Sequence, residues 1–115
     1  MNSPRRYWFR ACLASDIPQR GSIRVKHGGI EIAIFKTIND ELFALEDKCP
    51  HMGGPLSAGM VHGNCVTCPL HNWDISLESG QAQGADTGRT NRFEVKVEDE
   101  AVLLFVNMSV ELAVV

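Results

Sequence analysis

The sequence lacks a long hydrophobic run. Its longest stretch of large apolar residues, Val102–Val106, has the length of a strand and falls well short of the roughly 20 residues that a membrane helix needs. Basic charge is not in excess either, because 11 Lys and Arg against 14 Asp and Glu give a formal net charge of -3. A nucleic-acid-binding domain usually presents a basic face. We therefore predict that the chain binds neither membrane nor nucleic acid.

Motifs for catalysis and nucleotide binding are also missing. The sequence contains no nucleophile paired with a base, no phosphate-binding loop and no dinucleotide fingerprint. We therefore expect no catalytic residue in this chain. Any enzymatic activity would belong to an oxidoreductase complex in which the chain is an accessory subunit.

An export signal is not expected. Arg5 and Arg6 are followed by aromatic residues, but Arg10 and Asp16 interrupt the apolar stretch that such a signal requires. We predict a cytoplasmic protein, in which thiols stay reduced. In that compartment, clustered cysteine and histidine indicate a metal site more often than a disulfide.

Strand patterns occupy most of the chain, and no segment keeps a helical stripe of apolar residues over three turns. The expected strands are 7–13, 22–26, 30–35, 42–45, 73–77, 93–97 and 101–106. A chain of 115 residues is long enough to bury its own core, so we predict a single domain over residues 1–115. Its fold class is all-β, with small antiparallel sheets and a loop-rich insertion at about residues 46–74 that carries the candidate ligands.

The candidate ligands gather in the stretch CPHMGGPLSAGMVHGNCVTCPLH, residues 49–71, which holds three of the four cysteines and three of the four histidines. Two short units repeat within it. The first is Cys49-Pro50-His51 and the second is Cys68-Pro69-Leu70-His71. Each unit offers one thiol and one imidazole, which together predict a metal site.

Two metal chemistries could use these residues. A zinc site could be built from Cys49, Cys65, Cys68 and one histidine, since Cys65 and Cys68 have the C-x2-C spacing of zinc ribbons. A two-iron cluster would instead take one cysteine and one histidine from each unit and leave Cys65 unused. That pattern is typical of Rieske [2Fe–2S] centres. It predicts one cluster per chain, with Cys49, His51, Cys68 and His71 as the metal ligands.

Over nearly its whole length the chain resembles small Rieske ferredoxin-type proteins, and it is most similar to the small subunit of assimilatory NAD(P)H-dependent nitrite reductase. The segments that carry the closer resemblance are IAIF at 32–35, CPHMGGPLSAGMVHG at 49–63, CPLHNWDISLESGQAQG at 68–84 and the strand 93–97. The resemblance implies a Rieske-like fold and an electron-transfer role in nitrate assimilation. The implied partner is a large subunit that holds siroheme, a [4Fe–4S] cluster and flavin and reduces nitrite to ammonium.

The same ligand pattern occurs in the ferredoxin components of aromatic-ring-hydroxylating dioxygenases. In that alternative the chain would carry electrons from a flavin reductase to an oxygenase, or would dock on another redox partner through the cluster end. A zinc-binding interaction module is the third possibility.

Two departures from respiratory-chain Rieske domains follow from the resemblance. Those domains join their ligand loops by a disulfide, whose positions correspond here to Gly54 and Leu70, so that this chain has no such link. They also place a serine hydroxyl just after the second ligand unit, where this chain has Asn72 and Trp73.

The missing hydroxyl predicts a low reduction potential for this class of cluster. A hydroxyl that donates to a cluster sulfur stabilises the reduced state, and without it we expect a midpoint toward the lower end of the range of about -150 to +300 mV. Redox titration of the purified protein measures the midpoint. A value above about +100 mV would contradict the prediction.

Overall fold

The computed structural model describes residues 4–50, 53–70, 72–83 and 88–109. Its strands are β1 (Pro4–Leu13), β2 (Gly21–His27), β3 (Ile30–Lys36), β4 (Leu42–Glu46), β5 (Met60–His62), β6 (Cys65–Thr67), β7 (Asp74–Ser76), β8 (Arg92–Glu98) and β9 (Ala101–Ser109), with two single-turn 3-10 helices, η1 (Ala14–Asp16) and η2 (Leu56–Ala58). No α-helix occurs in these ranges, and the strand pairs are antiparallel. The all-β prediction is confirmed.

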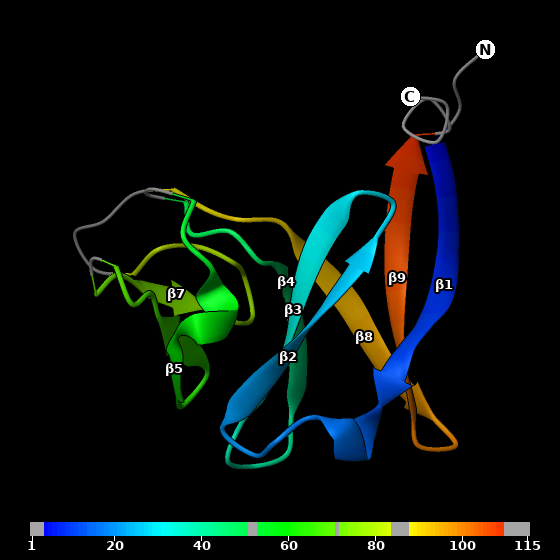
Figure 1. Cartoon of the computed structure of the whole chain (residues 1–115), viewed down its shortest axis with the longest axis horizontal. Helices are drawn as coiled ribbons and strands as arrows, with labels where there is room; N and C mark the ends of the chain where they lie inside the picture. Colours follow the sequence, from blue (N-terminus) through cyan, green and yellow to red (C-terminus); the bar gives the residue numbers. More distant parts are fainter. Residues whose placement is uncertain (1–3, 51–52, 71, 84–87, 110–115) are drawn as a thin grey trace.

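Within the described ranges the strands form two sheets. The larger has the order β1-β9-β8-β4-β3-β2 and the smaller the order β5-β6-β7. The two edge strands of the larger sheet meet through side chains: His27 of β2 stacks on Phe9 of β1 with ring centroids 3.9 Å apart, and His27 Nε2 lies 2.7 Å from the hydroxyl of Tyr7. The larger sheet therefore curls into a nearly closed barrel, with the smaller sheet beside it (Figure 1).

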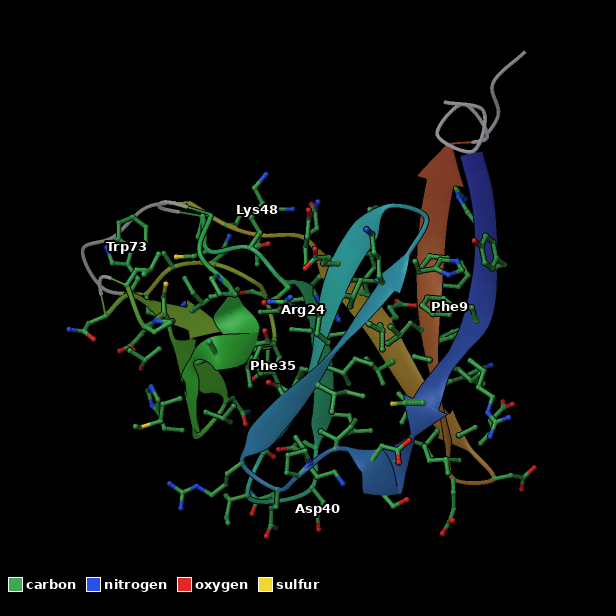
Figure 2. All side chains as sticks on the ribbon, in the orientation of Figure 1. Phe9, Arg24, Phe35, Asp40, Lys48 and Trp73 are labelled. Atoms are coloured by element: carbon green, nitrogen blue, oxygen red, sulfur yellow. The ribbon has the colours of Figure 1, made fainter. Side chains whose placement is uncertain are left out.

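Strand β3 is buried on both of its faces. Residues Ile32–Phe35 are fully shielded from solvent, and successive strand residues point to opposite faces. Ile32 and Ile34 enter the core inside the barrel, whereas Ala33 and Phe35 enter a second core shared with the smaller sheet. In Figure 2 the labelled Phe35 lies between the two parts of the molecule. The continuous apolar run of β3 thus joins the barrel to the smaller sheet.

The expected strands are present with small shifts at their ends. The segment expected at 73–77 shortens to β7, and β9 continues to Ser109. Two short strands lie outside the expected set. Strand β6 contains Val66 and Thr67, two β-branched residues that favour a strand. Strand β5 was not expected, because its three residues follow Gly59 in a glycine-rich stretch and show no period of their own. The boundaries of the predicted single domain stay a prediction. Among the described residues, no helix is long and apolar enough to cross a membrane.

Candidate metal centre

The first predicted ligand unit lies in a tight loop after β4. The amide of Cys49 donates to the carbonyl of Gly54 over 2.7 Å, and the amide of Gly53 donates to the carbonyl of Cys49 over 2.8 Å. Gly53 has a φ of +73°, a left-handed conformation that glycine adopts without steric penalty. The loop therefore closes back on Cys49. The predicted ligand His51 belongs to this loop by sequence and lies outside the described residues.

The second loop, which follows β6, repeats this hydrogen-bond pattern. The amide of Cys68 donates to the carbonyl of Trp73 over 2.7 Å, and the amide of Asn72 donates to the carbonyl of Cys68 over 3.0 Å. Asn72 has a φ of +56°, and asparagine is among the residues that tolerate this region best. The predicted ligand His71 lies outside the described residues. The two loops are thus built alike, each around its cysteine.

Both loop cysteines are buried in the same core. Cys49 is 2% exposed and Cys68 is 0% exposed, and both belong to the apolar core that joins the barrel to the smaller sheet. A Cβ placed on Gly54 would lie 3.8 Å from Cys68 Sγ, so the first loop passes beside the second cysteine. Neither thiol is in a disulfide. Two buried thiols in one core, on matched loops, fit the cysteine half of the predicted [2Fe–2S] ligand set.

The two loops touch each other at Gly54 and Leu70. A Cβ on Gly54 would overlap Leu70 Cδ1 and would lie 3.1 Å from Leu70 Cγ. These are the positions at which the resemblance placed the disulfide of respiratory-chain domains. Here the packing of a leucine against a bare glycine backbone takes the place of that covalent link.

A third segment returns to the first loop after the polar stretch at 84–87, which lies outside the described residues. A Cβ on Gly88 would lie 3.2 Å from Pro50 Cβ. Beyond it, the Thr90 hydroxyl donates to the carbonyl of Glu46 over 3.2 Å. A hollow of about 460 Å³ opens between this segment and the first loop, beside Cys49.

Cys65 faces away from the two loop cysteines. Its neighbour Val66 is buried in the shared core, so the alternation of β6 places Cys65 on the opposite face, across from His62. Burial, together with the nearby carboxylates of Asp74 and Glu78, raises the pKa of the Cys65 thiol. A raised pKa disfavours the thiolate that binds metals.

The zinc site drawn from Cys49, Cys65 and Cys68 is therefore not formed. Among the residues that the structure describes, no three His, Cys, Asp or Glu side chains converge on a point that could hold a metal ion. His62 also lies outside the centre, because it is exposed and its Nε2 lies 2.7 Å from Thr67 Oγ1.

One buried charge beside the first loop was not anticipated from the sequence. Asp47 precedes the first ligand unit, and its side chain is 0% exposed. A single aspartate near a cysteine matches no motif, so the sequence carried no signal for it. Trp73, at the end of the second loop (Figure 2), is half-buried and packs against the shared core.

The model of the Rieske [2Fe-2S] domain family matches residues 7–95 of the chain. The chain therefore belongs to the Rieske [2Fe–2S] family. Its cofactor is a Rieske-type [2Fe–2S] cluster, in agreement with the buried thiols of the two loops.

Similar proteins fall into several functional groups. The chain is 31% identical over 98 residues to the ferredoxin component of the naphthalene 1,2-dioxygenase/salicylate 5-hydroxylase systems of Ralstonia sp, covering 84% of this chain and 93% of the relative. It is 39% identical over 67 residues to the 4beta-methylsterol monooxygenase of Methylococcus capsulatus, which is 58% of this chain but only 18% of that enzyme. A structure assigned as the NADH-dependent nitrite reductase small subunit of Mycobacterium tuberculosis superposes with a TM-score of 0.80 at 17% identity, covering 89% of this chain and 96% of that one. At that identity the likeness concerns the fold alone.

Replacing either loop cysteine should abolish cluster binding. We expect Cys49→Ser and Cys68→Ser to lose iron and visible absorbance, because a serine oxygen is a poor substitute for a soft thiolate ligand. Cys65→Ser is the matched control and should keep both. Elemental analysis and the visible spectrum measure the outcome, and iron that survives both loop substitutions would show that the ligand assignment is wrong.

The contact between the two loops predicts a specific rescue. Gly54→Ala should lower the free energy of unfolding by about 1–3 kcal/mol, the usual cost of overpacking, because the new methyl group meets Leu70. Adding Leu70→Ala should recover most of that loss. Gly53→Ala serves as the control, since nothing lies within 4 Å of its Cβ and its left-handed φ, costing about 1–2 kcal/mol in alanine, is not relieved by Leu70→Ala. Urea unfolding measures each variant.

Proposed function

We propose that this Rieske electron-transfer protein serves as the small subunit of a cytoplasmic NAD(P)H-dependent nitrite reductase in nitrate assimilation. The observation that carries the proposal is the segment CPLHNWDISLESGQAQG at residues 68–84, whose resemblance to that subunit favours it over a dioxygenase ferredoxin. Its described part forms the second ligand loop and β7, and then folds back so that Ala82 bridges to Ile75. The resemblance therefore concerns the wall of the metal centre and the surface around it.

The residues of the chain fit a carrier of single electrons. When bound, the cluster accepts and returns one electron. Burial of Cys49 and Cys68 keeps their sulfurs away from water, and the paired backbone hydrogen bonds of both loops limit their movement when the charge changes. Nitrite reduction would take place in the large subunit, which docks at the end of the molecule that carries the two loops.

A ferredoxin of an aromatic-ring dioxygenase is the second candidate. The 31% identity to the Ralstonia ferredoxin component, over 93% of its length, favours it. The two candidates share the cluster, the fold and the single-electron chemistry. They differ in the protein that receives the electron.

Reconstitution with each partner separates the two functions. We expect nitrite-dependent NAD(P)H oxidation by a siroheme nitrite reductase large subunit to increase when the chain is added. The His71→Ala variant should leave the rate at the level of the large subunit alone, because the predicted ligand set is incomplete. A naphthalene dioxygenase and its reductase provide the parallel assay. Stimulation of naphthalene oxidation without any effect on nitrite reduction would replace the first proposal by the second.

A further inference from the structure

The carboxylate of Asp47 is shielded from solvent and fully hydrogen-bonded. Its side chain is 0% exposed, and Arg24 Nε donates to Oδ2 over 2.7 Å. Ser57 donates twice, from its amide to Oδ1 and from its hydroxyl to Oδ2, each over 2.7 Å. A buried carboxylate is tolerated only when it is paired and its oxygens accept hydrogen bonds. This one meets both conditions.

These contacts enclose the first ligand loop. Asp47 comes two residues before Cys49, and Ser57 belongs to η2, which follows the loop. The link from Asp47 to Ser57 therefore closes the chain on both sides of the loop. Asp47 and Ser57 are also attached to the barrel, because the amide of Asp47 donates to the carbonyl of Glu31 over 2.8 Å and the hydroxyl of Ser22 donates to the carbonyl of Ser57 over 2.9 Å.

The second ligand loop is anchored by different side chains. The hydroxyl of Thr67, which precedes Cys68, donates to Asp74 Oδ1 over 2.6 Å. The Asp74 side chain is 48% exposed, and His62 Nε2 lies 3.4 Å from its Oδ1. All of these residues belong to the smaller sheet or follow it directly. The two loops are therefore attached to different parts of the molecule, the first to the barrel and the second to the smaller sheet.

We infer that Asp47 is the positioning residue of the first ligand loop. Its carboxylate, neutralised by Arg24, holds Ser57 and thereby fixes Cys49 against the barrel, at the place where Gly54 meets the second loop. Because Cys49 must lie beside Cys68 to share one cluster, this inference rests on the proposed electron-transfer function. The hydrogen bonds themselves belong to the protein with or without its cluster.

The charge pair gives the first test. Asp47→Asn removes the buried negative charge and leaves the guanidinium of Arg24 with only the half-exposed carboxylate of Glu31, 3.3 Å away, so the midpoint potential of the cluster should rise. Arg24→Gln leaves the buried carboxylate unopposed, so the potential should fall. The double variant should return close to the wild-type value. Single variants that lose stability while their potentials do not move in opposite directions would show that the pair serves folding alone, and the inference would be overturned.

The second test does not need the cluster. Ser57→Ala removes one hydroxyl donor to Asp47, so the amides of Cys49 and Gly53 should exchange hydrogen faster in the cluster-free protein. The matched amides of Cys68 and Asn72 in the second loop should keep their rates, and Ser57→Thr should restore the first loop. Equal acceleration in both loops, or none in either, would overturn the inference. A chain that never binds a cluster would refute the proposed function and leave this measurement decisive for Asp47.

Discussion

The barrel core and the metal centre share one wall, which consists of β3 and β4. In both strands successive side chains point alternately into the barrel core and toward the metal centre. Ala44, for example, packs inside the barrel, and Leu45 packs on the side of the centre. A slip of one residue in the pairing of β3 with β4 would exchange these faces. It would also carry Cys49, only three residues beyond β4, out of the shared core. The register of this wall is therefore the condition on which the position of the first ligand depends.

The two ligand loops reach the same backbone geometry with different side chains. The left-handed position is Gly53 in one loop and Asn72 in the other, and the residue that accepts the hydrogen bond from the cysteine amide is Gly54 in one and Trp73 in the other. The difference is useful because the loops face each other. The bare backbone at Gly54 leaves room for Leu70 of the second loop, while Trp73 fills space against the shared core.

Much of the fold could be predicted from local pattern. Alternating apolar and polar residues predict β2 and β8. The apolar run of β3 predicts a strand, but it does not show that both faces of that strand are covered. Strand β5 could not be predicted, because Met60–His62 becomes a strand only by pairing with β6. From its glycine-flanked position His27 looks exposed, yet it closes the barrel against Phe9, which is distant in sequence. Such contacts depend on topology, which no local period encodes.

In the metal centre, too, the features that depend on short motifs could be predicted and those that depend on distant contacts could not. The spacing of the two units singled out Cys49 and Cys68, and the resemblance placed Gly54 opposite Leu70, because both depend on short motifs. Asp47 could not be recognised, since Arg24, the charged partner that makes its burial tolerable, lies 23 residues away in the sequence on β2. An aspartate in a loop is normally solvated.

Because the two ligand loops are anchored by different contacts, they differ in how far their residues are exposed to solvent. The first loop is held by the buried carboxylate of Asp47, which pairs with the half-exposed Arg24, and by the returning segment at Gly88. In the second loop the anchoring side chain of Asp74 is half-exposed, and Leu70 is 55% exposed. A leucine that is covered on one side by Gly54 and open on the other presents apolar surface at the contact between the two ligand loops. The bare backbone at position 54 thus has two effects: it lets the loops meet without a disulfide, and it leaves the apolar side chain of Leu70 at the junction of the two cysteine loops.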